Sequence, residues 1–475
     1  MEFGRRRFLG QMGVVSLAAL SAHAHWAQAG ARPGVGYGAL RPARDQRGVA
    51  VLALPEGFTL TTFSRTGEAF DRGVVPRNLD GMAAFDRPGG LLRLIRNHEV
   101  RNRPGEAAGA VPGAHGPHYD PRAGGGCMVL DYDPVTRTLA RQFVGLAGTH
   151  VNCAGGYAWQ RRAWLSCEET TDGPKQGYAK KHGYVYALPA ELERAVDPVP
   201  LVAMGRFKHE AACADAEGVV YLTEDAGSGR GSGFYRYLPN DRADLAKGGR
   251  LQMLRAKAAP YLDARQNRRV GKLLACDWVT LSDPDPDLEA GAPGCFEQGR
   301  LGGGTQFNRL EGLWLGRDGK TVFFSSTSGG DAKGPDINQD GYVQGYGQIW
   351  RYTPVGAHAG ALALHFESPG ASVLDSPDNL CVTPRGGLLV CEDDASPGDS
   401  DRHPLAQSGN VNRLVGLGSD GAPFTFAVNL LNDSELTGAT FSPDGGLLFV
   451  NLFGDGRPDS GMSCAIAGPW ARGPL

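Results

Sequence analysis

A cysteine and several carboxylates stand at corresponding places in short segments that recur along the chain. The candidate metal ligands are one thiol and five carboxyl groups: Cys153, Glu168, Glu169, Glu210, Glu311 and Asp393. Carboxylates prefer hard cations such as Ca²⁺ or Fe³⁺, whereas a thiolate prefers a transition metal. Carboxylates that lie close together must become protonated or bind cations, because their charges repel. If the fold gathers these residues, they indicate a site with more than one kind of metal; otherwise they are solvated ends of strands.

The recurring segments, called repeats below, share one pattern. They cover residues 79–99, 152–169, 209–225, 310–326, 377–393 and 436–452, and the last four align over 17 residues without a gap. The second residue of the successive repeats is Asp80, Cys153, Glu210, Glu311, Asp378 and Thr437. The closing pairs are His98/Glu99, Glu168/Glu169, Glu224/Asp225, Ser325/Ser326, Glu392/Asp393 and Asn451/Leu452. Polar residues therefore mark both ends of most repeats.

Each repeat is typical of a β-hairpin. An apolar run such as 219–222 (VVYL) or 447–450 (LLFV) follows a turn that contains glycine, as strands and tight turns require. A hairpin brings the second residue beside the closing pair, about 5 Å away. The intervals have room for further strands, as at 183–188, 233–239 and 347–354. We therefore predict an all-β fold, a six-bladed β-propeller with inserted loops and a metal site in the central cavity; a β-sandwich is the alternative.

The N-terminal residues have the features of an export signal. Arg5 and Arg6 precede a mildly apolar stretch to Ala22, and Ala27-x-Ala29 follows as a cleavage site. Residues 1–29 are therefore predicted to be a twin-arginine signal peptide, with a Sec signal as the alternative. Residues 30–475 are then one propeller domain, with 240–300 as an insertion between blades. We expect a periplasmic or extracellular protein that the twin-arginine export machinery carries in folded form.

Composition excludes some classes of function. The formal net charge of −3 shows no nucleic-acid footprint, and no apolar stretch after the N-terminus is long enough to span a membrane. A monomer is expected, because a closed ring of strands leaves no free edge. Nine cysteines form no dense framework, although Cys381/Cys391 and Cys276/Cys295 could oxidise. The segment 336–341 opens like an EF-hand loop but lacks the acid at its twelfth position, so a separate calcium site or a polar connection both fit.

Eight motifs in order resemble one known family. They are THVNCAGG (149–156), WLSCEET (164–170), GRFKHEAA (205–212), VYLTEDAG (220–227), FNRLEGLWLG (307–316), GQIWRY (347–352), PDNLCV (377–382) and LLVCEDD (388–394). Together they resemble the PhoX-type alkaline phosphatases from about residue 75 to the end of the chain. That family consists of exported bacterial phosphomonoesterases with a six-bladed propeller and an iron–calcium cluster in its central cavity.

The resemblance implies roles for individual residues. Cys153 resembles the iron-ligating cysteine of the family, and Glu168 and Glu169 resemble tandem glutamates that hold calcium and bridge metals. Glu210, Glu311 and Asp393 resemble further ligands, and Arg309 resembles the arginine that binds the phosphoryl oxygens. Additional ligands or supporting residues are Asn152, Glu224 and Asn379. His150 and His209 are expected to face away from the cluster, because strand alternation turns them to the other side.

The implied function is the hydrolysis of small-molecule phosphate monoesters with iron (Fe³⁺) and calcium as cofactors. A metal-bridging oxo or hydroxo group would be the nucleophile, and Arg309 would neutralise charge on the phosphoryl oxygens. Two other functions remain open. One is a calcium-dependent lactonase or esterase propeller, and the other is a non-enzymatic binding propeller that calcium stabilises. Cys153 and Arg309 favour phosphate chemistry, because a calcium-dependent lactonase has no use for either residue.

Overall fold

The computed structural model describes residues 36–71, 73–113, 116–227, 229–337, 341–393, 404–405 and 411–475. The predicted signal peptide, residues 1–29, lies outside these residues, as do Asn338 and Asp340 of the EF-hand-like segment. Strands dominate the described residues, whose single α-helix is α3 (Cys295–Leu301). The prediction of an all-β fold is therefore confirmed.

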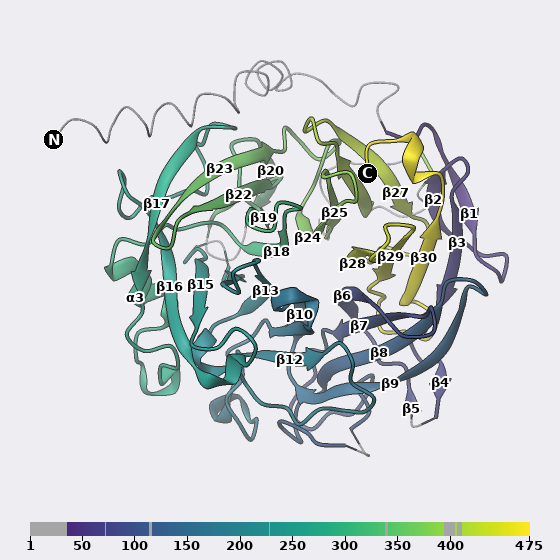
Figure 1. The fold of residues 1–475 in the computed structure, drawn as a ribbon, viewed down its shortest axis with the longest axis horizontal. Helices are drawn as coiled ribbons and strands as arrows, with labels where there is room; N and C mark the ends of the chain where they lie inside the picture. The colour runs from purple at the N-terminus through teal and green to yellow at the C-terminus, as the bar shows by residue number, and fades with distance from the viewer. Residues whose placement is uncertain are drawn as a thin grey trace.

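Every repeat forms an antiparallel hairpin. The six hairpins are β6 (Leu79–Asp86) with β7 (Leu92–His98), β10 (Asn152–Tyr157) with β11 (Ala163–Glu168), β13 (His209–Ala214) with β14 (Val220–Glu224), β18 (Leu310–Leu315) with β19 (Val322–Ser326), β24 (Pro377–Val382) with β25 (Leu388–Glu392), and β28 (Leu436–Phe441) with β29 (Leu447–Leu452). Their first strands contact one another in the cyclic order β6, β10, β13, β18, β24, β28 and back to β6. Figure 1 shows these strands around the centre of the molecule, in a propeller-like arrangement.

Further strands add to the outer side of each hairpin. They are β8 (Gly125–Asp133), β9 (Thr138–Thr149), β12 (Val185–Pro189), β15 (Phe234–Pro239), β16 (Gly249–Ala256), β17 (Leu273–Thr280), β22 (Gln348–Val355), β23 (Ala359–Glu367), β26 (Arg413–Leu417), β27 (Pro423–Asn429) and β30 (Met462–Ala467). The expected extra strands at 183–188, 233–239 and 347–354 are confirmed as β12, β15 and β22, each paired with the second strand of its hairpin.

Two connections between units were not apparent in the sequence. Strand β17 pairs with β23, so that two units merge into one nine-stranded sheet. The stretch 240–300, expected to be an insertion between blades, thus contains two strands of that sheet in addition to α3. At the other side, β3 (Thr59–Phe63) pairs with β30, so that a strand from early in the chain completes the last sheet.

The remaining elements lie at the periphery. Strands β1 (Leu40–Arg44) and β2 (Ala50–Pro55) extend the sheet of β27, and two small hairpins pair β4 (Ala69–Phe70) with β5 (Gly73–Val74) and β20 (Lys333–Ile337) with β21 (Val343–Gly345). Short 3₁₀ turns are η1 (Trp159–Arg161), η2 (Pro174–Gln176), η3 (Val202–Met204), η4 (Leu245–Lys247), η5 (Leu288–Ala290) and η6 (Trp470–Arg472). Within the residues described, no helix has the length and apolar character that crossing a membrane would need.

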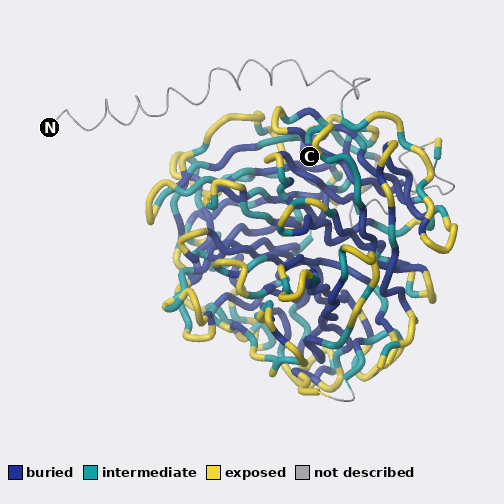
Figure 2. The backbone as a smooth tube through the Cα atoms, turned by 45° about the vertical axis from the view of Figure 1, so that its right-hand side comes forward, coloured by how far each residue is buried: buried dark blue, intermediate teal, exposed yellow. Residues whose placement is uncertain are grey.

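The core lies between the sheets and around the centre, where the backbone is buried, while turns at the periphery are exposed (Figure 2). Large side chains such as Trp164 and Trp350 are fully buried between neighbouring sheets. The first strands approach one another so closely that small residues are required. A Cβ on Gly438, whose φ is +60°, would lie 2.6 Å from the carbonyl oxygen of Asp80. All nine cysteines are described, and each is a buried free thiol.

Candidate metal centre

The second residues of the repeats converge at one end of the ring because every hairpin has the same irregularity. In five hairpins the register of pairing shifts between the first and the fourth residue of the repeat. In the hairpin of β28 and β29 it shifts one residue later, between Thr437 and Thr440. Such a bulge leaves the second residue outside the regular ladder and redirects its side chain. The side chains at this position are buried, and five of them are acidic or a thiol: Asp80, Cys153, Glu210, Glu311 and Asp378.

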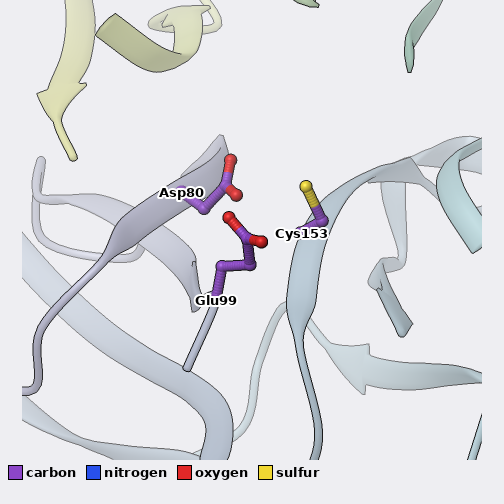
Figure 3. Close-up of side chains that lie close together, drawn as sticks. All are labelled: Asp80, Glu99 and Cys153. Carbon is purple, nitrogen blue, oxygen red and sulfur yellow. The ribbon is translucent and has the colours of Figure 1, made fainter. Parts of the chain in front are cut away.

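These residues form four overlapping groups in which the potential ligand atoms lie within 4.8 Å of one another. The groups are Asp80/Glu99/Cys153, Cys153/Glu169/Glu210, Glu210/Glu311/Asp378 and Asp378/Asp393/Glu435. Figure 3 shows the first group, in which the carboxyl groups of Asp80 and Glu99 and the thiol of Cys153 point toward the same space. Neighbouring groups share Cys153, Glu210 or Asp378, so the arrangement is one continuous cluster of eight carboxyl groups and one thiol.

A repeated backbone hydrogen bond fixes the ends of each hairpin. The residue just before the repeat, here called the leading residue, accepts a hydrogen bond from the N–H of the first residue after the second strand, the trailing residue. These pairs are Asn78/Glu99, Val151/Glu169, Lys208/Asp225, Arg309/Thr327, Ser376/Asp393 and Glu435/Phe453, with distances of 2.8 to 3.2 Å. Leading and trailing residues therefore lie side by side. Four of them belong to the cluster, namely Glu99, Glu169, Asp393 and Glu435, and the others form its rim.

The structure brings together five of the six residues that were predicted to bind metal. Cys153, Glu169, Glu210, Glu311 and Asp393 all belong to the cluster, whereas Glu168 does not.

The carboxyl group of Glu168 points away from the cluster and is fully satisfied by the protein. It accepts hydrogen bonds from the backbone N–H groups of His150, Gly183 and Tyr184 at 2.8, 2.9 and 3.1 Å. Its Oε1 also lies 2.7 Å from Nδ1 of His182. Strand alternation explains the difference, since successive residues of a strand face opposite sides. Glu168 therefore anchors the end of β11, and Glu169 turns toward the cluster.

The three residues expected to give additional or supporting contacts also make protein hydrogen bonds. The carboxyl group of Glu224 accepts from Tyr235 Oη at 2.6 Å and from the N–H of Gly233 at 3.0 Å, and it pairs with Arg230. Asn152 donates to Ser166 Oγ at 2.9 Å. Asn379 donates to Oδ1 of the cluster residue Asp378 at 2.9 Å. Glu224 and Asn152 thus stabilise strand ends, and Asn379 orients a cluster residue.

Five acids near the cluster were not among the predicted site residues: Asp80, Glu99, Asp225, Asp378 and Glu435. The sequence did carry a signal for four of them. Asp80 and Asp378 occupy the second position of their repeats, and Glu99 and Asp225 close theirs. Glu435 is a leading residue, and nothing in the repeat pattern marks that position as functional.

Two closing pairs were placed one residue too early. Leu310 pairs with Ser326 and Leu436 with Leu452, whereas the corresponding residues His209 and Pro377 pair with Glu224 and Glu392. The turns 316–321 and 442–447 are one residue longer than the turns 215–219 and 383–387, which explains the offset. The trailing residues of these two repeats are therefore Thr327 and Phe453, which offer no carboxylate.

The cluster is electrostatically unfavourable without bound cations. Burial, and then the neighbouring acids, raise the pKa values of Asp80, Glu210 and Glu311 well above their ordinary range. Burial also raises the pKa of Glu99 and of Asp378 to about 7. Both carboxyl oxygens of Glu210 and Oδ1 of Asp80 are buried without a hydrogen-bond partner. Buried oxygens without partners are costly, and a coordinated cation supplies what they lack.

Three cationic side chains lie at the rim, which is too few to balance the acids. Nη2 of Arg101 lies 2.5 Å from Oε1 of Glu99 and also pairs with Glu169. Nη2 of Arg309 lies 2.8 Å from Asp225 and 3.2 Å from Glu311. Burial acts against ionisation of Asp225, but Arg309 and then Lys208 lower its pKa. The excess of acids and the unpartnered oxygens therefore fit a site for several cations.

The histidines stay out of the cluster, as expected from strand alternation. Nε2 of His150 lies 3.4 Å from Asp172, and Nε2 of His209 lies 2.9 Å from the carbonyl oxygen of Gly205. Neither belongs to any of the four groups. The donor set is thus made of carboxylates and one thiol.

Comparison with known proteins shows which family the chain belongs to. The sequence matches the family described as alkaline phosphatase PhoX over residues 35–134 and 131–456. Pseudomonas fluorescens PhoX, solved in complex with vanadate as a transition state analogue, has a TM-score of 0.62 and 19% identity; the match covers 91% of this chain and 98% of that one. The gluconolactonase XC5397 from Xanthomonas campestris has a TM-score of 0.42 and 12% identity, with 93% and 100% covered. No curated protein matches this chain. Because the family match spans most of its length, the chain belongs to the PhoX family of alkaline phosphatases.

Proposed function

We propose that this protein is a metal-dependent phosphomonoesterase, that its six units are the blades of a six-bladed propeller, and that the cluster at the centre holds iron and calcium. Family membership supports the phosphatase activity. The observation that carries the metal assignment is the continuous cluster, in which three residues are shared between neighbouring groups. A shared carboxylate or thiolate can bridge two cations, so the cluster is suited to several metals in contact with common ligands.

The donor atoms suggest how the metals are distributed. Cys153 belongs to the groups with Asp80 and Glu99 and with Glu169 and Glu210. A thiolate favours a transition metal, so these two groups are assigned to iron. The groups around Asp378 contain only carboxyl oxygens, which suit a hard cation such as calcium.

Such a cluster, when bound, neutralises the phosphoryl oxygens and supplies an activated oxygen nucleophile. The protein adds Arg309, whose guanidinium stands at the rim with 33% of the side chain exposed. Asp225 accepts from Nε and Nη2 of Arg309 at 3.1 and 2.8 Å and so fixes the plane of the guanidinium. A fixed, planar guanidinium binds two phosphoryl oxygens and stabilises the charge that develops as the ester breaks.

Metal analysis combined with an activity assay tests this proposal. The purified protein is expected to contain both iron and calcium and to hydrolyse p-nitrophenyl phosphate. Cys153→Ala should lose iron and activity, whereas Cys213→Ala, which removes a buried thiol outside the cluster, should keep both. Calcium alone without phosphatase activity would overturn the proposal and favour a lactonase or a binding propeller.

We also propose that the twin-arginine signal in residues 1–29 delivers the folded protein to the periplasm or the medium. The support is the sequence pattern around Arg5 and Arg6. Replacing both by lysine should retain the protein in the cytoplasmic fraction while metal content and activity of that fraction stay normal. Unchanged export of the double variant would contradict the proposal.

A further inference from the structure

A cavity of about 460 Å³ is lined by residues that neighbour the metal centre in the chain. Three of its lining residues stand next to cluster or rim residues in the chain. Thr171 follows Glu169 by two residues, Ala226 directly follows Asp225, and Lys208 is the leading residue two positions before Glu210. The opposite wall is the segment 288–297, which includes Ala292. Because the backbone N–H of Asp225 donates to the carbonyl oxygen of Lys208 at 3.2 Å, the cavity lies close to the rim of the cluster.

The charges that line the cavity leave two cationic groups without an acidic partner. Arg230 is paired with both acids of the lining, Glu224 and Glu297, the latter at 3.1 Å. Lys208 makes no ion pair within 4.0 Å in the described part of the chain. Lys208 nevertheless lies close enough to Asp225 to favour its ionised form.

Arg206 is the other cationic group without a carboxylate. It is 1% exposed, and its Nε and Nη2 donate to the carbonyl oxygens of His182 and Thr171 at 3.0 and 2.9 Å. Its Nη1 is buried and has no hydrogen-bond partner. Among the residues described Glu289 forms no ion pair with Arg206, although its Oε1, also buried without a hydrogen-bond partner, and Nη2 of Arg206 lie on the same side of Gly173. A buried guanidinium nitrogen without an acceptor is costly, and an anionic ligand would supply the acceptor.

Lys208 and Arg309 occupy equivalent positions in successive units. Each is a leading residue two positions before a cluster glutamate, and each lies beside Asp225. Arg309 also contacts the cluster residue Glu311, so a phosphoryl group held by Arg309 would have Lys208 and the cavity on the neighbouring side.

We propose that this cavity is the subsite for the leaving group of the phosphate monoester, and that Lys208, supported by Arg206, selects leaving groups that carry a second anionic group such as a carboxylate. This inference rests on the proposed phosphatase function. The volume of the cavity is within the range of small-molecule pockets, so the cavity is large enough for an aromatic or sugar-sized leaving group. Its lining combines an apolar wall that contains Phe207 with unpaired cations, which suits an organic acid.

The test uses two phenyl phosphates of equal size, one with a 4-carboxylate and one with a 4-carboxamide. The metal-loaded protein is expected to prefer the carboxylate, as measured by the ratio of kcat/KM values. Lys208→Met keeps the aliphatic stem and removes the charge, so this ratio should fall about ten-fold. Lys320→Met, an exposed lysine in the turn at the other end of β18, is the matched control and should leave the ratio unchanged.

A cavity-filling variant and a binding measurement make the outcome independent of the lysine. Ala292→Trp should slow both phenyl esters relative to methyl phosphate, because the aromatic leaving group no longer fits. Calorimetry with 4-hydroxybenzoate, the product, should show binding that Lys208→Met weakens about ten-fold. If the wild-type protein hydrolyses both esters but Lys208→Met leaves the ratio and product binding unchanged, the inference is wrong and the phosphatase function stands. If the fully metal-loaded wild-type protein hydrolyses neither ester, both are wrong.

Discussion

The metal-free protein is expected to lose stability as the pH rises, because acids that are buried together resist ionisation. The perturbation is removal of all metals with a chelator, followed by equilibrium unfolding in urea. Glu99 and Asp378 are each 7% exposed, and burial raises the pKa of both to about 7. The folded state therefore holds these two protons more tightly than the unfolded state does. Their contribution to stability is complete below about pH 4 and disappears as the pH rises through about 7.

The magnitude follows from the difference between the pKa values of the two states. A difference of one pKa unit corresponds to about 1.4 kcal/mol, which gives about 3 kcal/mol for Glu99 and about 4 kcal/mol for Asp378. The two groups interact, since Asp378 is among the neighbours that raise the pKa of Glu99, so the total is smaller than the sum of the separate values. A loss of several kcal/mol between pH 5 and pH 8 is a large fraction of the usual stability of a folded domain, which is about 5 to 15 kcal/mol.

The free energy of unfolding is measured by urea denaturation at half-unit steps of pH from 5 to 8, with and without metals. The metal-loaded protein should show the opposite slope, because metals bind the deprotonated ligands and so stabilise the fold at higher pH. The double variant Glu99→Gln/Asp378→Asn, kept metal-free, should show a flatter profile than the metal-free parent. If the metal-free parent is equally stable or more stable at pH 8 than at pH 5, the description of the cluster as acids buried without cations is wrong.

Three further predictions concern single residues. Arg309→Met should lower kcat/KM for p-nitrophenyl phosphate by about 10² while metal content stays the same, and full activity in this variant would exclude a role in binding the phosphoryl group. Glu168→Gln should lower the free energy of unfolding in urea by about 2 kcal/mol and keep the metals, whereas Glu169→Gln should lower metal content. Loss of metal in Glu168→Gln but not in Glu169→Gln would contradict the placement of the two residues. Asp80→Asn should reduce bound metal per chain as measured by elemental analysis, and its failure to do so would remove Asp80 from the cluster.

The sequence predicts much of the ring because hairpins have a strong local signal. Alternating apolar residues and turns with glycine specify where each strand begins, and the second residues of the repeats, such as Cys153 and Glu210, are gathered as expected. What local patterns do not specify is which member of a polar pair faces the cluster. In Glu168/Glu169 and Glu224/Asp225 the second member faces it, and the choice depends on where the strand leaves the sheet.

The part of the site that the sequence did not predict depends on contacts between distant segments. Arg101 joins Glu99 to Glu169 across two units, and Glu435 reaches the cluster from a loop that the repeats do not mark. The extra residue in the turns 316–321 and 442–447 is likewise invisible in an ungapped alignment, because the residues after the turn still appear apolar. Such features appear only when side chains are placed in three dimensions.

The pairing of β3 with β30 has a consequence for how the protein is made. Translation proceeds from the N-terminus, so β3 leaves the ribosome long before its partner exists, and its exposed edge must wait for almost the whole chain. The pairing of β3 with β30 is then a late step in folding that joins distant segments of the polypeptide, and it is expected to be slow because the two strands are far apart in sequence. A prematurely terminated chain that lacks β30 would leave the last sheet unfinished and β3 without its partner. The pairing of β3 with β30 thereby distinguishes complete from incomplete polypeptides.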